Sequence, residues 1–139
     1  MRYYVRPKGN QQTMDMIVAI IQPSKLDDVK EALVKAGIQG MTVTGVKGFG
    51  RQKGRPLPFL GLYDFQGKLF TVDFLPKVRI ELVVPSDMTD LVVDSIVHAT
   101  QTGNIGDGKV FVLPVSKVVR IRTGERDQTA LSIEEVAVN

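Results

Sequence analysis

The residues best suited to chemistry lie in the glycine-rich stretch TGNIGDGKVF, from Thr102 to Phe111. Gly106 and Gly108 allow backbone conformations that other residues avoid, so that successive N–H groups can line one concavity and bind phosphate oxygens. Lys109 adds a positive charge beside it. A Walker phosphate loop lies between a strand and the start of a helix, whereas this stretch follows a predicted helix and precedes a predicted strand. An ordinary glycine turn after a helix is the simpler alternative.

A pair of arginines forms a second basic cluster. Arg120 and Arg122 alternate with apolar residues in VVRIR, which predicts a strand with both guanidinium groups on one face. Two such groups side by side repel each other unless an anion lies between them. A solvated basic edge strand would show the same pattern.

A third cluster, KGFGRQKG, runs from Lys47 to Gly54. It combines flexible backbone with two cations, Arg51 and Lys53, and with the amide of Gln52, which can donate a hydrogen bond or coordinate through oxygen. All three clusters fall at predicted strand ends. The sequence therefore favours a site for an anionic small molecule.

The elements that must position these clusters alternate along the chain. Apolar or alternating runs predict strands at MIVAII (Met16 to Ile21), TVTGVK (from Thr42), VRIELVV (from Val78), VFVLPV and VVRIR. One predicted helix has Ser24 as its cap, with Asp27 as a weak capping-box partner, and stops at Gly37. The other begins after Ser86 or Asp87 and ends at Gly103, with an apolar stripe of Met88, Leu91, Val92, Ser95, Ile96 and Ala99.

The order of these elements predicts an α+β fold of the ferredoxin-like kind. Two split β-α-β halves would form one antiparallel sheet with both helices on one face. Residues 1–13 are expected to be a loose extension, 14–126 the domain, 50–72 a long loop within it, and 127–139 a tail. Loops of that length are uncommon unless they have a function.

Composition limits the classes of function. The chain has 139 residues, 43% of them hydrophobic and 24% charged, which is typical of one soluble domain. Its net charge of +3 is too small and too dispersed to predict nucleic-acid binding. The absence of cysteine excludes thiolate catalysis and fits a cytoplasmic protein. We expect His98 to lie on an exposed helix surface, and no window predicts a membrane span or signal peptide.

Four successive blocks carry a resemblance to a known family. They are GIQGMTVTGVKGFGRQKG (Gly37 to Gly54), VDFLPKVRIELVVP (Val72 to Pro85), TGNIGDGKVF, and VVRIRTGE (Val118 to Glu125). Through these four blocks, the chain resembles the P-II signal-transduction proteins from Met14 to about Arg126, apart from the long loop. The resemblance implies a homotrimer that binds ATP or ADP in clefts between neighbours, senses 2-oxoglutarate, and regulates other proteins through the long loop. It implies a regulator rather than an enzyme.

The resemblance also implies roles for individual residues. The phosphate-binding positions correspond to Thr102, Gly106, Asp107, Gly108, Lys109, Arg120, Arg122 and Arg51, those around the adenine to Ile20, Thr42 and Val83, and the backbone near the ligand to Gly48 and Gly50. For 2-oxoglutarate they correspond to Gln52, Lys53, Gly54 and Lys77. Gln52 would coordinate Mg²⁺ together with ATP phosphates, since this hard cation prefers oxygen ligands.

The long loop departs from the family pattern. Phe70 occupies the position of the tyrosine that is modified in some P-II proteins, and it has no hydroxyl group to modify. Tyr63 is a different candidate for modification, or simply one aromatic residue among several. The loop is rich in apolar residues, which predicts either anchors for a partner or side chains folded back on the trimer. The expected anchors are Phe59, Leu60, Tyr63, Phe65 and Phe70.

The partner stays open at this point. A loop of the usual family type regulates an ammonium transporter, and this loop lacks the arginine used there. We expect a regulated target such as a membrane transporter or an enzyme, with recruitment of the protein to the membrane by a transporter partner. The alternative function is an adenine-nucleotide-responsive regulator of a non-ammonium membrane transporter that has no 2-oxoglutarate response.

Overall fold

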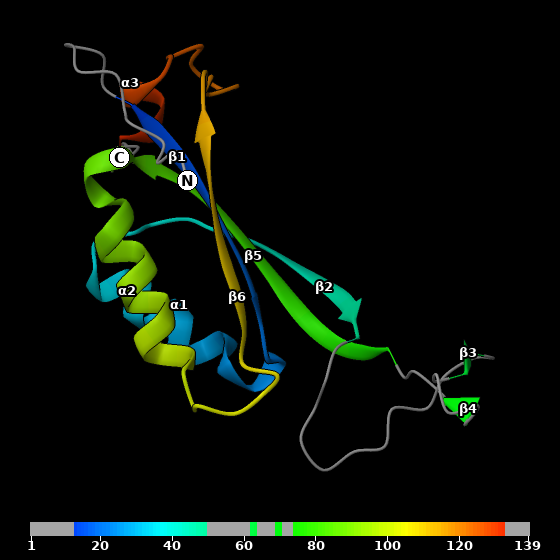
Figure 1. The fold of residues 1–139 in the computed structure, drawn as a ribbon. Helices are drawn as coiled ribbons and strands as arrows, with labels where there is room; N and C mark the ends of the chain where they lie inside the picture. The colour runs from blue at the N-terminus through cyan, green and yellow to red at the C-terminus, as the bar shows by residue number, and fades with distance from the viewer. Residues whose placement is uncertain (1–12, 50–61, 64–68, 71–73, 133–139) are drawn as a thin grey trace, which may run out of the picture.

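The fold is known from a computed structural model, which describes residues 13–49, 62–63, 69–70 and 74–132. The main strands are β1 (Met14–Ile21), β2 (Thr42–Gly48), β5 (Leu75–Pro85) and β6 (Gly108–Val115). The helices are α1 (Leu26–Lys35), α2 (Thr89–Thr100) and the short α3 (Gln128–Leu131). Figure 1 shows α1 and α2 together on one side of the sheet, with α3 at the end from which β6 runs into the C-terminal segment.

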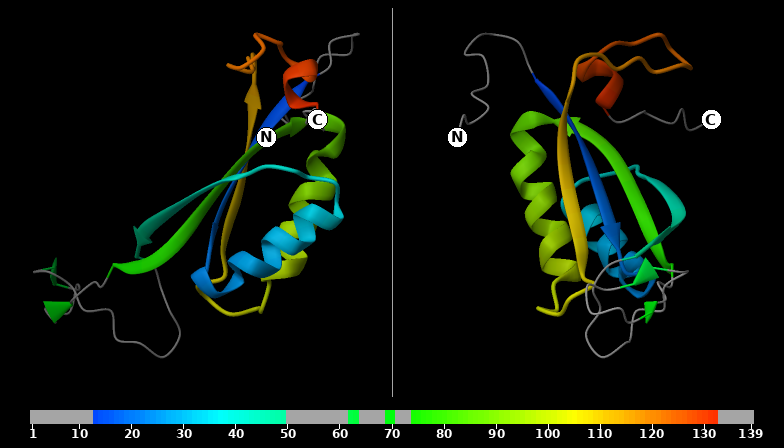
Figure 2. Two further views of the ribbon diagram at one scale, coloured as in Figure 1. Left: turned by 180° about the vertical axis from the view of Figure 1, so that it is seen from behind. Right: turned by 45° about the vertical axis from the view of Figure 1, so that its right-hand side comes forward.

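The four main strands form one antiparallel sheet in the order β2-β5-β1-β6. β1 lies inside the sheet and pairs with β5 on one side and β6 on the other, so that Ile17 is opposite both Leu82 and Val112. Both helices cover the same face, as the two views of Figure 2 show. This arrangement confirms the predicted α+β fold with two β-α-β halves.

The core fills the space between the sheet and the two helices. The fully buried side chains there include Ile17 and Ile80 from the sheet, Val29 from α1, and Val92 and Ile96 from α2. Burial of such aliphatic side chains stabilises a fold by about 1.5–3 kcal/mol each. The helical periodicity predicted most of this core. It was wrong for Leu91, which is 52% exposed on α2.

The predicted helix caps were wrong at both N-termini. Each helix is preceded by a single 3-10 turn, η1 (Pro23–Lys25) before α1 and η2 (Ser86–Met88) before α2. The N-cap residues are Lys25 and Met88, and neither makes a side-chain capping hydrogen bond. The N-cap of α1 lies one residue after Ser24, and that of α2 lies two residues after Ser86 and one after Asp87, because a tight turn comes before each helix. Asp27 therefore has no capping box to complete.

The helix C-termini gave one correct and one wrong prediction. Gly37 ends α1 with a φ of +88°, and the N–H groups of Gly37 and Ile38 donate to the carbonyls of Val34 and Leu33. This is the Schellman arrangement that favours glycine after a helix. α2 instead ends at Thr100, before Gly103, and the hydroxyl of Thr100 donates to the Ile96 carbonyl at 2.8 Å.

Two further predictions about strands need correction. VVRIR is no strand: Val119 makes one isolated bridge to Arg126, and the residues between them form a turn. The long loop, predicted without secondary structure, contains the short strands β3 (Leu62–Tyr63) and β4 (Leu69–Phe70), which pair antiparallel. In the part of the chain that the structure describes, no helix is long and apolar enough to cross a membrane.

Candidate ligand-binding site

The sheet face away from the helices is the open face, and its rows of side chains follow from the strand register. One row runs from Thr44 through Arg79 and Ile20 to Lys109, because each is the direct partner of the next. Directly paired residues point to the same face. The same register places three further predicted residues on this face, because every second residue of a strand points to the same side. They are Thr42 opposite Glu81, Val83 opposite Met16, and Lys77 opposite Val46.

The open face carries a shallow cavity of about 570 Å³. It is lined by Met16, Val18 and Ile20 of β1, Arg79 of β5, and residues 110–113 of β6. Across this surface, Arg79 is ion-paired with Glu81 at 2.5 Å. The cavity therefore has a mostly apolar lining, with the Arg79–Glu81 ion pair at it.

The glycine loop, residues 102–109, joins α2 to β6 at one end of the open face. Gly106 and Gly108 have φ values of +104° and +109°, in the region that favours glycine. A β-carbon at position 108 would lie 1.8 Å from the carbonyl oxygen of Ile20. Gly108 thus packs directly against the backbone of β1, and the expected approach of Gly106 and Gly108 to phosphate oxygens stays a prediction.

Asp107 braces the glycine loop from within. Its carboxylate accepts hydrogen bonds from the N–H of Thr102 at 2.8 Å, from the N–H of Gly103 at 2.9 Å, and from the Thr102 hydroxyl. These bonds, those from Thr102 above all, lower the pKa of Asp107 below its usual 3.8. The carboxylate of Asp107 thus holds the loop in shape.

The glycine loop is also tied to the sheet through one carbonyl. The Gly106 oxygen accepts a hydrogen bond from Gln22 Nε2 at 2.7 Å and another from Lys77 Nζ at 3.1 Å. Burial lowers the pKa of Lys77 below 10.5, and the nearby charge of Asp107 opposes that shift. Gln22 was missed from the sequence, because it is a single glutamine after a strand and lies 84 positions from Gly106.

The arginine pair lies in a hairpin that follows β6, here called the arginine hairpin (residues 118–127). The side chain of Arg120 is only 13% exposed; it donates to Glu125 at 2.9 Å and to the carbonyls of Ala130 and Ser132. Hydrogen bonding from Thr123, together with the charges of Arg120 and Arg122, lowers the pKa of Glu125. The backbone turns at Arg120, whose N–H donates to Glu125 and whose carbonyl accepts from Gly124.

Because this segment is a turn, the two arginines do not share a strand face as predicted. Arg122 is exposed at the tip of the turn beside Ile121, which is 99% exposed. Arg120 holds the hairpin against the C-terminal residues. The tip thus presents one cation and one aliphatic side chain outward.

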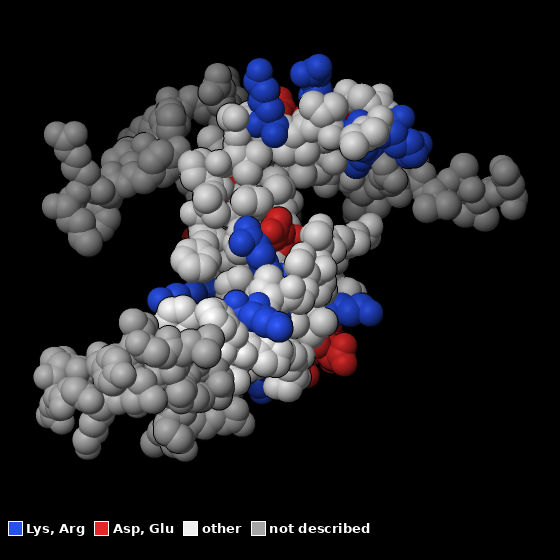
Figure 3. All heavy atoms as spheres, turned by 90° about the vertical axis from the view of Figure 1, so that its right-hand side faces the viewer, with Lys and Arg blue, Asp and Glu red and all other residues white. Residues whose placement is uncertain are grey.

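Within one chain, the arginine hairpin lies far from the glycine loop. They adjoin opposite ends of β6, and Figure 1 shows the loop at the bottom and the hairpin at the top of the sheet. At about 3.3 Å per residue, the eight residues of β6 separate them by roughly 25 Å. Figure 3 shows basic side chains at the top of the face it presents and others from its middle downward.

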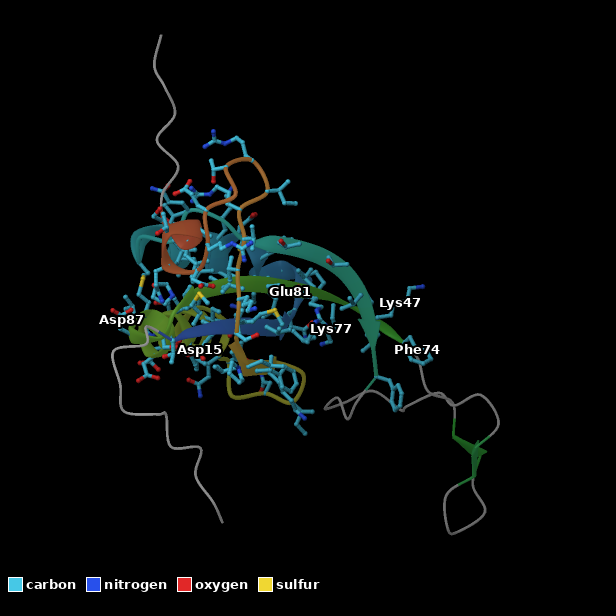
Figure 4. The ribbon with its side chains drawn as sticks, turned by 90° about the horizontal axis from the view of Figure 1, so that it is seen from above. Asp15, Lys47, Phe74, Lys77, Glu81 and Asp87 are labelled. Atoms are coloured by element: carbon cyan, nitrogen blue, oxygen red, sulfur yellow. The ribbon has the colours of Figure 1, made fainter. Side chains whose placement is uncertain are left out.

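The base of the long loop lies at the glycine-loop end of the molecule. A β-carbon on Gly48 would touch Lys77 Cγ at 3.8 Å, and Phe49 and Phe74 form an edge-to-face ring pair with centroids 5.4 Å apart. Figure 4 shows Lys47, Phe74 and Lys77 on the side where the loop leaves. The remaining predicted site residues of this region lie outside the described residues: Gly50, Arg51, Gln52, Lys53, Gly54, Phe59, Leu60 and Phe65, with the side chains of Tyr63 and Phe70.

Comparison with known proteins identifies the family. The sequence profile of the family described as "Nitrogen regulatory protein P-II" matches residues 14–125. The chain belongs to the P-II family. It is 59% identical over 118 residues to nitrogen regulatory protein P-II 1 of Escherichia coli (strain K12), which covers 85% of this chain and 100% of the relative. With P-II of Synechocystis sp., the identity is 54% over 118 residues and the coverage is the same.

A solved P-II structure agrees with the fold. The crystal structure of Arabidopsis thaliana PII bound to citrate superimposes with a TM-score of 0.67 at 39% identity, covering 86% of this chain and 94% of that chain. P-II proteins are regulators that act on target proteins, and they form trimers. As a P-II protein, the chain is a signal-transduction protein of nitrogen regulation rather than an enzyme, as its sequence predicts.

Proposed function

We propose that this P-II protein is a homotrimeric sensor that binds ATP or ADP in the clefts between subunits. It also binds 2-oxoglutarate together with Mg²⁺ and ATP, and it controls a partner through the loop at residues 50–72. The functional unit is the domain of residues 14–126, flanked by residues 1–13 and 127–139. The protein acts in the cytoplasm and reaches the membrane only through a membrane-bound partner.

The separation of the two cationic segments along β6 carries this proposal. Phosphates need several donors around them, and roughly 25 Å of strand keeps the arginine hairpin of a chain away from its own glycine loop. In a trimer, the hairpin of a neighbour takes that place. Arg122 of the neighbour then contacts the phosphates beside Lys109, while Arg120 contributes from the same hairpin and fixes its shape.

The remaining nucleotide contacts come from the open face and the loop base. Ile20, Thr42 and Val83 surround the adenine, and the glycine loop, Gly48, Gly50 and Arg51 face the phosphates. The common face of Ile20, Thr42 and Val83 supports this assignment, because it continues into the row that ends at Lys109.

The effector 2-oxoglutarate binds next to Lys77. The ammonium of Lys77 is partly desolvated, which favours an anionic partner. Among the described residues, no group of three histidine, cysteine or acidic side chains could hold a metal ion. By resemblance to P-II proteins, Gln52 would be the protein ligand of Mg²⁺, with Lys53 and Gly54 beside it, and ATP and the effector would supply further oxygens, which this hard cation prefers. The citrate bound by the Arabidopsis protein supports binding of a small carboxylate by this fold.

Isothermal titration calorimetry tests the proposal. We expect ATP and ADP to bind, and 2-oxoglutarate to bind only when Mg²⁺ and ATP are present. Gln52→Ala should abolish 2-oxoglutarate binding and spare ADP. Binding of nucleotides alone would favour the second candidate, an adenine-nucleotide-responsive regulator of a non-ammonium membrane transporter. Absence of nucleotide binding would overturn both.

A further inference from the structure

Two side chains from the two central strands hold one carbonyl of the glycine loop. Gln22 follows the end of β1, and Lys77 lies on β5. Their nitrogens donate to the same Gly106 oxygen at 2.7 and 3.1 Å, and both hydrogen bonds are partly buried. A carbonyl oxygen has two lone pairs, so the two donors satisfy it fully.

The peptide unit after Gly106 is fixed from its other side as well. The N–H of Asp107 belongs to this unit, points away from the Gly106 oxygen, and lies 3.4 Å from the Asn104 carbonyl. Rotation of the unit would break these contacts together. The orientation of the glycine loop therefore depends on the donors at the Gly106 oxygen.

The two donors differ in what else they can bind. The Gln22 amide is neutral, so an anion does not attract it away from a carbonyl. The Lys77 ammonium is charged, has three N–H donors, and is partly desolvated. A carboxylate ligand therefore competes for Lys77 and leaves Gln22 in place.

We propose that Gln22 is a positioning residue that keeps the glycine loop oriented for phosphate when Lys77 turns from Gly106 to a carboxylate ligand. The identities of the two ligands, ATP and 2-oxoglutarate, rest on the proposed function. In this arrangement the loop keeps one orientation in both ligand states, and Lys77 serves the effector without releasing the loop.

A double-mutant cycle tests the shared carbonyl. Gln22→Leu, Lys77→Met and the double variant are compared for ATP affinity by calorimetry, with Gln39→Leu as the control at an exposed glutamine outside the site. Gln22→Leu should weaken ATP binding about threefold or less, because Lys77 still holds the carbonyl. The double variant should bind ATP at least about tenfold more weakly than the product of the single effects, because a partly buried carbonyl then has no donor. Strictly additive effects would overturn the proposal.

A second measurement, of 2-oxoglutarate binding, distinguishes a positioning role of Gln22 from a general loss of structure. With ATP saturating, Gln22→Leu should weaken 2-oxoglutarate binding about tenfold, more than it weakens ATP binding alone, since Lys77 can then leave only by stranding the carbonyl. Gln22→Lys keeps a donor but a charged one, which a carboxylate attracts as it attracts Lys77; it should restore ATP affinity and rescue 2-oxoglutarate binding only in part. Equal losses for the two ligands, or no rescue, would contradict the exchange of donors.

Hydrogen exchange makes the test independent of the ligands. In the nucleotide-free protein, the amides of residues 106–109 should exchange faster in the double variant and near the wild-type rate in each single variant. If the wild-type protein binds no ATP, the proposed function fails while this measurement still decides whether Gln22 holds the loop. Unchanged exchange in the double variant would overturn the role of Gln22.

Discussion

Gly108 approaches the backbone of Ile20 so closely that a β-carbon on Gly108 would lie 1.8 Å from the Ile20 carbonyl oxygen. Its φ of +109° adds a second requirement for glycine. We expect Gly108→Ala to lower the free energy of unfolding by about 3 kcal/mol or more, because β6 must shift against β1. ATP affinity should fall with it. Urea unfolding and calorimetry measure the two effects.

Two other glycines provide matched controls. Gly124 has a positive φ of +72° but open space around the position of a β-carbon, so Gly124→Ala should cost about 1 kcal/mol. Gly40 has open space and no such constraint, and Gly40→Ala should stay within about 0.5 kcal/mol of wild type. A Gly108→Ala variant as stable as Gly124→Ala would contradict the close approach to Ile20.

Substitutions of Lys109 and Arg120 should have different effects, the first on ligand binding and the second on local stability. Lys109 is exposed, so Lys109→Ala should leave unfolding unchanged and weaken ATP binding about tenfold or more by loss of a charge-assisted contact. Arg122→Ala should behave in the same way.

Arg120→Ala should instead lower the free energy of unfolding by about 1–3 kcal/mol and speed hydrogen exchange in residues 120–132, because it removes bonds to Glu125, Ala130 and Ser132. Normal ATP affinity in a folded Lys109→Ala protein would exclude Lys109 from the site.

The lowered pKa of Asp107 predicts how the glycine loop responds to acid. Its pKa lies below 3.8 in the folded protein, so its bonds to Thr102 and Gly103 are fully present above that value. They are lost only as the pH falls through the lowered folded pKa. The amide NMR signals of Thr102 and Gly103 should therefore stay constant from about pH 7 to pH 4 and shift below it. In Asp107→Asn they should be displaced at neutral pH and lack this transition; a midpoint above 3.8 in the wild type would contradict the assignment.

Deletion of residues 58–67 tests the long loop. The truncated protein should bind ATP and form trimers as the full chain does, because the sheet pairing of β2 with β5 is left intact. It should no longer capture the regulated partner in a pull-down from membranes and cytosol, since the expected anchors Phe59, Leu60, Tyr63 and Phe65 are removed. Retention of the same partner, or loss of the trimer, would show that the loop has a structural role instead.

Local sequence patterns predicted those features that local physics decides. The apolar run of β1 and the apolar stripe of α2 identified a buried strand and a helix, and Gly37 marked a helix end, because each depends on periodicity or on one backbone angle. The prediction of a strand at Arg120 and Arg122 was wrong, because alternation with valine and isoleucine is typical of a strand but does not ensure one. A turn closed by the bond from Arg120 to Glu125 and by contacts with Ala130 and Ser132 overrides that pattern.

The sequence indicated the backbone of the candidate site but not its internal contacts. Gly106 and Gly108 have the positive φ angles that favour glycine, whereas the role of Lys109 at a ligand stays a prediction. The tie from Gln22 to Gly106 depends on strand order, which brings positions 84 residues apart together. Resemblance to P-II proteins supplied Lys77, whose contact with Gly106 no local pattern encodes.

The Phe49–Phe74 ring pair forms a neck where the long loop leaves the sheet. Below it, the pairing of β2 with β5 continues to Gly48 and Leu75, so both ends of the loop are fixed by the domain itself. The entropy of closing such a loop rises slowly, by about 0.6 kcal/mol for each doubling of its length. We therefore expect that the length and sequence of the loop can be changed without loss of the domain's fold, because the ring pair and the strand pairing next to it hold the two ends of the loop together.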